Sequence, residues 1–318
     1  MREPALPIAP RGFPALPYPQ DNPPTAAKIA LGRRLFFDTR LSRDSTISCA
    51  TCHKPAGSFA DPGKPTTFGI DGHLTGRNSP SLANVAYNRT FFADGSAPSL
   101  EAQALVPILN RLEMDMDTAK LATRLARETV YREIFPAAWG DGAITPTRIA
   151  ASIASFERAL LSGGSTYDRF LSGDSGALSG EARRGRTLFF GGKAACFRCH
   201  DGFNFTDQEF HNTGLDSDTY DPGRIAVTGS AFDEGRFKTP SLRNLTLTPP
   251  YMHDGRFTTL RAVIDHYNAG AVGMPNRDPL LGPLGLDEKE IGDLIAFLEA
   301  LTDTTLAANP DFGDPWAP

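Results

Sequence analysis

The sequence predicts a mainly α-helical protein built from two similar domains, preceded by an extended arm. Three observations lead to this prediction. A five-residue cysteine and histidine motif occurs twice, the residues around its two copies repeat at a constant offset, and much of the remaining chain has apolar residues at helical spacing. The length of 318 residues suits two domains of roughly 150 residues each.

Composition narrows the class of protein. Hydrophobic residues make up 40% of the chain and charged residues 22%, which is ordinary for a soluble globular protein. The net charge of −5 argues against a nucleic-acid-binding protein and against a basic membrane-binding surface. No apolar run approaches the roughly 18 residues that a membrane span needs. The first residues, MREPALPIAPRGFP, lack the apolar core of a signal peptide.

The N-terminal segment is rich in proline. Residues 1–24 contain eight prolines, a density that prevents helix formation and favours extended chain. We expect this arm to pack over the surface as a terminal strap; a recognition peptide is the alternative.

The two cysteine motifs are the most specific feature of the chain. Each reads C-x-x-C-H, with the residues Cys49, Cys52 and His53 in the first copy and Cys196, Cys199 and His200 in the second. In this pattern both thiols bond to haem vinyl groups and the histidine ligates the iron. The motifs contain all four cysteines of the chain, so none is left for a disulfide. A thioredoxin-like dithiol or a zinc site are the alternatives, but neither explains a histidine after each pair. The motifs predict two covalent c-type haems.

The residues around the motifs repeat. GRRLFF at 32–37 precedes the first motif and GRTLFF at 185–190 precedes the second. PSLAN at 80–84 matches PSLRN at 240–244, and the same offset of 160 aligns further identical residues downstream. We therefore expect two cytochrome c-like haem domains related by internal duplication. The expected ranges are a Pro-rich arm (1–24), an N-terminal haem domain (25–165), a C-terminal haem domain (178–305) and a tail (306–318), with a Gly- and Asp-rich linker at about 162–178.

Two apolar stripes predict helices that close the two domains. The first stripe consists of Ile149, Ile153, Phe156 and Leu160, with Thr145 and Pro146 as a start signal. The second consists of Ile291, Leu294, Ile295, Leu298 and Leu301, with Asp287 before Glu288 and Glu290 at its N-terminus. Both stripes are expected to be core.

Comparison of the two halves bears on the sixth ligand of each iron. At the offset of 160, Tyr267 aligns with Pro107. A tyrosine ligates iron through its phenolate, whereas a proline has no ligating group. If Tyr267 fills the sixth position of the second iron, the matching position at the first iron is open, as peroxide binding requires. The alternative ligands are Met252, Met274, His253 and His266, although His266 neighbours Tyr267 and points about 100° away from it on a helix.

These residues carry a family resemblance. LFFDTRLSRDSTISCATCH, RNSPSLAN and TPSLRNLTLTPPYMHDG resemble the bacterial dihaem cytochrome c peroxidase and MauG family, and the resemblance runs from about Ala27 to Leu301. It implies that the first haem is peroxidatic and that Gln103, Pro107 and Glu113 form its distal pocket. Glu113 would exchange protons with bound peroxide while Gln103 orients it.

The resemblance also implies a calcium ion between the haems. Asn78 would provide a side-chain oxygen, and Thr248 and Pro250 would provide backbone carbonyls. A turn capped by Asn78, without an ion, is the alternative.

The family divides at the second haem. Its peroxidases carry methionine where this chain has Tyr267, and MauG-type enzymes carry tyrosine. A hard, anionic phenolate favours higher oxidation states of iron, whereas a thioether raises the reduction potential. The resemblance therefore implies a hydrogen-peroxide-dependent oxidase that forms a high-valent iron state and oxidises Trp or Tyr side chains of a partner protein. The alternatives are a cytochrome c peroxidase supplied by a small redox protein and a non-catalytic dihaem electron carrier.

The chain departs from the family pattern at two positions. Ala93, in FFADG, replaces the tryptophan that usually lies between the haems, and Ala194 replaces a surface tryptophan of MauG. Of the remaining histidines, His73 is expected to lie in a surface loop rather than act as a removable haem ligand, and His211 is expected to be structural. Since haem attachment in such cytochromes occurs outside the bacterial cytoplasm, we expect a mature periplasmic protein from which the export signal has been removed.

Overall fold

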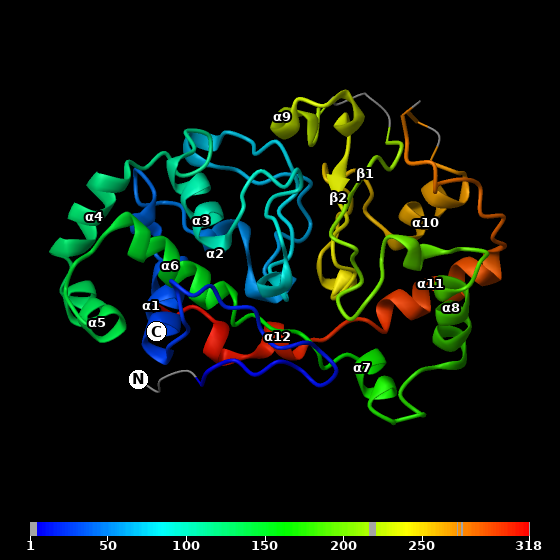
Figure 1. Ribbon diagram of the computed structural model, residues 1–318, viewed down its shortest axis with the longest axis horizontal. Helices are drawn as coiled ribbons and strands as arrows, with labels where there is room; N and C mark the ends of the chain where they lie inside the picture. The colour runs from blue at the N-terminus through cyan, green and yellow to red at the C-terminus, as the bar shows by residue number, and fades with distance from the viewer. Residues whose placement is uncertain (1–4, 216–220, 272, 275, 318) are drawn as a thin grey trace. The chain divides into compact units, whose positions relative to one another are not determined.

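The computed structural model describes residues 5–215, 221–271, 273, 274 and 276–317 and is mainly helical (Figure 1). Its contacts divide the chain into two units. Unit 1 is formed by the described residues of Met1–Asn88, Pro98–Ser162 and Thr305–Pro318, and unit 2 by those of Arg89–Ala97 and Gly163–Thr304. Each unit contains one C-x-x-C-H motif. This division follows the two halves of the repeat, with two exchanges of chain that are described below.

The helices of each unit match the expected architecture. Those of unit 1 are α1 (Ala26–Phe36), α2 (Cys49–Cys52), α3 (Leu100–Leu109), α4 (Thr118–Arg127), α5 (Thr129–Trp139), α6 (Pro146–Glu157) and α12 (Thr305–Ala308). Those of unit 2 are α7 (Thr166–Leu171), α8 (Gly180–Phe190), α9 (Ile225–Thr228), α10 (Leu260–Asn268) and α11 (Glu288–Glu299). Unit 2 also contains a two-stranded antiparallel sheet of β1 (Phe210–His211) and β2 (Phe237–Lys238).

In unit 1, α1 packs across α6 (Figure 1). The contact depends on Gly32, because a Cβ there would lie 1.8 Å from the Ser152 carbonyl oxygen and 2.9 Å from the Phe156 Cβ. Phe156 also packs against Phe36 and Phe59, and all three rings are fully buried. The predicted start of α6 is confirmed: Thr145 is its N-cap and Pro146 its first residue.

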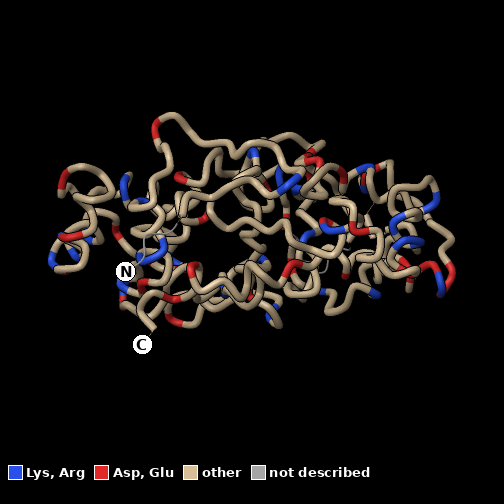
Figure 2. The backbone as a smooth tube through the Cα atoms, turned by 90° about the horizontal axis from the view of Figure 1, so that it is seen from below, with Lys and Arg blue, Asp and Glu red and all other residues tan. Residues whose placement is uncertain are grey.

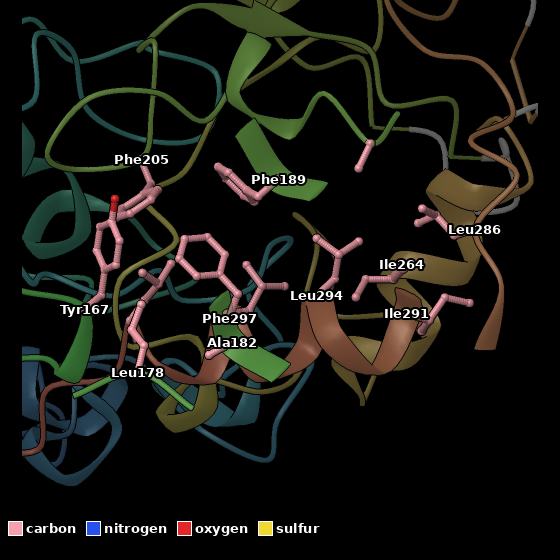
Figure 3. Close-up of a cluster of buried hydrophobic side chains, with 13 residues drawn as sticks. Tyr167, Leu178, Ala182, Phe189, Phe205, Ile264, Leu286, Ile291, Leu294 and Phe297 are labelled. Atoms are coloured by element: carbon pink, nitrogen blue, oxygen red, sulfur yellow. The ribbon is translucent and has the colours of Figure 1, made fainter. Parts of the chain in front are cut away.

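Unit 2 has the same crossing, made by α8 and α11 (Figure 1). A Cβ at Gly185 would lie 1.9 Å from the Asp293 carbonyl oxygen and 2.9 Å from the Phe297 Cβ. The Phe297 ring packs in a core with Tyr167, Phe189 and Phe205 (Figure 3).

The predicted start of α11 is also confirmed. Asp287 is its N-cap and forms a capping box with Glu290. A further contact recurs after the crossing helices: the Asn84 amide donates to the Leu160 carbonyl at 2.8 Å, and the Asn244 amide donates to the Leu301 carbonyl at 3.3 Å. These matched contacts support the proposal of an internal duplication.

Residues 89–97 pack with the opposite half of the repeat. The expected N-terminal domain included this segment, but its contacts place it in unit 2. The Ala93 carbonyl accepts a hydrogen bond of 2.7 Å from the Lys238 amide, and the Asp94 carbonyl accepts one of 3.0 Å from Arg224. The Arg224 guanidinium in turn stacks on Phe210, 3.7 Å from the ring centroid.

The C-terminal tail belongs to unit 1 and is not a separate segment. Arg33 on α1 donates to the carbonyl oxygens of Gly313 and Pro310, at 2.7 and 2.8 Å. The Trp316 indole donates to the Arg34 carbonyl at 3.1 Å, and the Phe312 ring packs against Phe156.

The Gly- and Asp-rich stretch at 162–178 is not a free linker. It contains α7, which begins in a capping box between Ser165 and Asp168. Asp168 forms a buried, bidentate ion pair with Arg243 at 2.9 and 3.0 Å. Composition indicated a linker here because the tertiary partner of Asp168 lies 75 residues away.

The described part of the N-terminal arm, residues 5–24, contains no helix or strand. The Tyr87 hydroxyl donates to the Pro14 carbonyl at 3.0 Å, and the Asn22 side chain is buried and hydrogen bonded to Glu101. These contacts fit the expected strap.

Within the described residues, no helix is long and apolar enough to cross a membrane. Basic and acidic residues are interspersed along both units (Figure 2).

Candidate haem-binding sites

The first C-x-x-C-H motif lies in a short helix of unit 1 whose residues are half-buried. Ser48 and Thr51 form a capping box that starts α2, and His53 follows its last residue. The His53 Nδ1 lies 2.8 Å from the Phe59 carbonyl oxygen. Because a carbonyl only accepts, Nδ1 carries the hydrogen and Nε2 has its lone pair available for a metal. Burial lowers the pKa of His53, which favours this neutral form.

The second motif repeats this arrangement in unit 2. The His200 Nδ1 lies 3.0 Å from the Phe205 carbonyl oxygen, so its Nε2 is likewise available. Burial also lowers the pKa of His200. Both phenylalanines are fully buried in the cores described above, which fixes the carbonyl that orients each histidine.

The four thiols are free in this structure, and those of Cys49, Cys52 and Cys196 are unlike the thiols of a redox dithiol. Burial raises the pKa of Cys52 to about 11 and that of Cys196 to about 12, and it raises the pKa of Cys49 further. A reactive dithiol has the opposite property, a lowered pKa. Two half-buried thiols beside an oriented imidazole fit covalent haem attachment in each unit.

The structure places Glu113 beside the C-terminal end of α3, the helix that carries Gln103 and Pro107. A tight turn follows α3, in which the Asn110 carbonyl accepts from the Glu113 amide at 3.0 Å. The Asn110 side chain donates to the Glu113 carboxylate at 2.7 Å. Burial raises the pKa of Glu113, although the Asn110 hydrogen bond opposes the rise. The carboxyl is therefore suited to exchanging protons nearer neutral pH than an exposed glutamate.

A second loop packs over this turn. The Ile70 amide donates to the Glu113 carbonyl at 2.7 Å. Gly69 allows this approach, because a Cβ there would lie 1.9 Å from the Leu112 carbonyl oxygen. Glu113 also contributes to raising the pKa of Cys49 and of Cys52, so its carboxyl lies close to the first motif.

Tyr267 lies on α10 close to the second motif. Burial raises the pKa of its phenol, and the charges of Cys199 and Cys196 raise it further. Among the described residues, the phenol has no hydrogen-bond partner. Tyr267 is half-buried, and a phenol close to both thiols and without a protein partner fits a ligand of the cofactor expected there.

The alternative ligands have other contacts. The His266 Nε2 lies 2.8 Å from the Thr213 carbonyl oxygen, and the His253 ring stacks on Phe237 at 3.8 Å. The Met274 sulfur accepts a hydrogen bond from Asn212 at 3.8 Å. Met252 lies in a turn with a φ of 73°. The contacts of His266, His253 and Met274 favour Tyr267 over these three residues.

The two alanines at the departures from the family pattern lie in unit 2. Ala93 belongs to the segment 89–97, and its carbonyl is held by Lys238. Ala194 is buried.

The three residues expected to bind calcium belong to different units. Asn78 is in unit 1, where its side-chain nitrogen donates to the carbonyls of Lys64 and Pro65 at 3.0 and 3.2 Å. This leaves the amide oxygen directed away from those carbonyls. Thr248 and Pro250 are in unit 2.

The remaining histidines have the expected surroundings. His73 is exposed in a loop. The His211 ring lies between Asp278 at 2.7 Å and Asp207 at 2.9 Å. Among the described residues, one group has the spacing of a metal site, formed by Cys199, Asp207 and His211. Cys199 belongs to the second C-x-x-C-H motif, so this group lies at that motif.

Sequence reasoning missed three contributors to these sites. The carbonyls of Phe59 and Phe205 orient the histidines, and no residue pattern reveals a backbone acceptor. Glu157, on α6, is buried and contributes to raising the pKa of Cys49. Alignment of the two crossing helices could have revealed it, because Glu157 follows Phe156 where Leu298 follows Phe297.

Comparison with known proteins is consistent with this geometry. Residues 26–176 match the family described as di-haem cytochrome c peroxidase. The methylamine utilization protein MauG of Methylorubrum extorquens is 40% identical over 289 residues, covering 90% of this chain and 81% of that protein. The cytochrome-c peroxidase IdrP1 of Denitromonas iodatirespirans is 38% identical over 324 residues, covering 92% of this chain and 86% of that protein.

A solved structure extends the similarity to the whole fold. It is described as a MauG-like protein associated with microbial copper homeostasis, and it superposes with a TM-score of 0.91 at 36% identity, covering 97% of this chain and 98% of the other. The chain therefore belongs to the di-haem cytochrome c peroxidase and MauG family, whose members carry two haems and are oxidoreductases that act with hydrogen peroxide.

Proposed function

We propose that this enzyme is of the MauG type and uses hydrogen peroxide to oxidise tryptophan or tyrosine side chains of a partner protein. The observation that supports this most directly is the position of Tyr267, which lies close to both thiols of the second motif and whose phenol has no hydrogen-bond partner among the described residues. A phenolate ligand favours the oxidised states of iron that such a reaction needs.

The bound haems would accept two oxidising equivalents from peroxide and pass them to the partner. Reduction of one peroxide to two waters consumes two electrons and two protons, and the oxidised side chain supplies the electrons. We propose that Glu113 takes a proton from the attacking peroxide oxygen and returns it to the departing one, while the Gln103 carboxamide orients the peroxide. Pro107 offers no ligating group, which keeps the site open to peroxide.

We further propose that the enzyme works in the periplasm and holds one calcium ion through Asn78, Thr248 and Pro250. A related structure is associated with copper homeostasis, which makes proteins that handle copper the first candidates for the partner. Neighbouring genes are the place to search for it.

A cytochrome c peroxidase is the competing function, since relatives of that name match the chain as fully as MauG does. The deciding experiment adds peroxide to the fully oxidised enzyme and follows its absorption and electron paramagnetic resonance spectra. The proposal expects reaction without prior reduction and a resting state with one high-spin and one low-spin iron. An oxidised enzyme that is inert to peroxide and becomes active only after one-electron reduction would establish the peroxidase instead.

Two variants connect this result to the ligand. Tyr267→Phe should change the low-spin signal and leave the high-spin signal, because only the second iron loses a ligand. Tyr267→Met should move the enzyme toward peroxidase behaviour, with a requirement for prior reduction. Met252→Leu is the matched control and should change neither signal. Loss of the low-spin signal in Met252→Leu would show that the ligand is assigned to the wrong residue.

A further inference from the structure

Glu157 is a buried acid that the proposed reaction does not use. It is the last residue of α6 and is 4% exposed. Its Oε2 atom is buried without a hydrogen-bond partner among the described residues. An ionised carboxylate in such a place is strongly disfavoured, because it has lost its hydration and gained no donor. Burial accordingly raises the pKa of Glu157 to about 8.

The charged neighbours of Glu157 do not offset the cost of ionising its buried carboxyl. Attraction by Arg158 lowers the pKa of Glu157, but less than burial raises it, and the Arg158 guanidinium is committed to a bidentate ion pair with Glu101 at 2.6 and 2.9 Å. Glu101 itself raises the pKa of Glu157 by repulsion. Lys28, on the facing helix α1, donates to Asn22 and to the Pro23 carbonyl.

Glu157 lies close to the residues of the first motif. After burial, its charge is the largest cause that raises the pKa of Cys49, the thiol expected to bond to the first haem. The preceding residue, Phe156, packs its ring 6.2 Å from Phe59, and the Phe59 carbonyl holds the His53 imidazole. Any change of charge at this haem would therefore be felt at Glu157 through a medium with little water to screen it.

Unit 2 provides an internal comparison. The crossing of α1 with α6 matches that of α8 with α11, with Phe156 corresponding to Phe297 in contact with the glycine. The residue after each phenylalanine is Glu157 in unit 1 and Leu298 in unit 2, where it is part of the hydrophobic core. At this position of the crossing, unit 1 therefore has a buried acid where unit 2 has a leucine.

We infer that Glu157 is a proton-binding site coupled to the oxidation state of the haem in unit 1. When an external donor supplies one electron to that haem, the local positive charge falls by one, and the Glu157 carboxylate takes one proton from solvent. When the electron leaves, the proton is released. The coupling is reciprocal, so the reduction potential of this haem depends on the protonation of Glu157. Unit 2, with Leu298, lacks this coupling.

This inference depends on haem attachment at Cys49 and is independent of the identity of the oxidised substrate. It gives unit 1 a store for one of the two protons that peroxide reduction consumes. Glu157 binds and releases a proton without contacting peroxide. It is distinct from Glu113, which the proposed function places against peroxide.

The test measures the reduction potential of each haem in the holoenzyme as a function of pH by spectroelectrochemistry. The potential of the haem bound to Cys49 should fall with rising pH across a window around pH 8, and this dependence should disappear in Glu157→Gln and Glu157→Leu. The potential of the second haem should be the same in wild type and variants. Glu299→Gln, which alters an exposed carboxylate on α11, is the control and should retain the wild-type pH dependence. An unchanged pH dependence in Glu157→Gln would overturn the inference.

Two further measurements keep the test decisive if the variants bind haem poorly. Infrared difference spectra of the wild-type holoenzyme should show a protonated carboxylic acid that gains intensity on reduction at about pH 8, and a spectrum without it would contradict the inference. Unfolding provides the second readout. The folded-state pKa lies above the ordinary value of 4.5, so the stabilising effect of neutral Glu157 is lost as pH rises through about 8. The free energy of unfolding of the wild type should therefore fall between about pH 5 and about pH 9 more than that of Glu157→Gln does. An equal fall in both proteins would contradict the inference.

Discussion

The two glutamates close to the first motif have different local environments, and this difference determines what each can do. Glu113 lies in a loop, is partly exposed and accepts a hydrogen bond from Asn110, so it can ionise at moderate cost. Glu157 lies at the end of a core helix, and its Oε2 has no donor in the part of the chain that the structure describes. A carboxyl that must give and take a proton within one turnover needs an environment like that of Glu113.

Glu113→Gln should slow the reaction of the oxidised enzyme with peroxide by about 100-fold or more, the usual effect of removing an acid and base group. The wild-type rate should rise with pH through the raised pKa of Glu113, because only the carboxylate can accept the peroxide proton. The variant should lose this dependence. Stopped-flow absorption at several pH values measures both effects. Glu133→Gln, on the exposed side of α5, is the control and should react as wild type does.

Sequence reasoning reached the site residues that belong to repeated motifs. The cysteines and histidines were recognisable by spacing, and comparison of the halves identified Tyr267 opposite Pro107. It could not reach residues whose role depends on tertiary packing. Nothing around Glu157 indicates that Arg158, its neighbour in sequence, is committed to Glu101 on another helix.

At the scale of helices, the two crossings at Gly32 and Gly185 show how little space the fold leaves between its longest elements. In each crossing, a backbone carbonyl of one helix occupies the place that a Cβ atom would take on the glycine of the other helix. The crossings in turn place Phe156 and Phe297 in the cores from which the histidine-binding carbonyls project. In each unit, the helix contact and the cofactor site therefore depend on one glycine, Gly32 in unit 1 and Gly185 in unit 2.

Gly185→Ala should destabilise unit 2 by about 1–3 kcal/mol or more, because its Cβ would lie 1.9 Å from the Asp293 carbonyl oxygen and α8 would have to move away from α11. Gly292→Ala is a matched control on α11. A Cβ there meets nothing within 4 Å, so this variant should be neutral or more stable by about 0.4–1 kcal/mol. Chemical denaturation followed at the Soret band of the holoenzyme compares the two. Equal stability of both variants would show that the crossing is looser than the structure indicates.

Prediction of elements succeeded where signals were local. Both closing helices begin at the predicted caps, and the prolines of the arm exclude helix as expected. It failed for the stretch at 162–178, where glycines and aspartates suggested a linker. Asp168 belongs there to the capping box of α7 and also forms a buried ion pair with Arg243. The ion pair could not be predicted from the sequence, because it depends on the tertiary fold that brings Arg243 to Asp168.

For the whole molecule, neither unit is a continuous piece of chain. The tail returns to unit 1, and residues 89–97 leave that unit for the other. The sequence repeat gave no sign of these exchanges, because they consist of contacts and not of residue identities.

Deletion of residues 309–318 should weaken unit 1 and leave unit 2 unaffected. The deletion removes both carbonyl partners of Arg33 and the Phe312 ring that packs on Phe156. Hydrogen exchange with mass spectrometry should show faster exchange in α1 (26–36) and α6 (146–157) and unchanged exchange in α8 (180–190). Removal of residues 317 and 318 alone is the control, since it retains these partners. Uniformly faster exchange in both units would show that the tail stabilises more than its own unit.

The return of the tail has a consequence for biosynthesis. Residues 305–318 are synthesised after all of the residues 163–304. The contacts that this segment makes in unit 1 can therefore form only after the whole of unit 2 has been made, although the cysteines of unit 1 are synthesised first. Unit 2 has no such dependence, because its earlier segment, residues 89–97, precedes the rest of the unit in the chain.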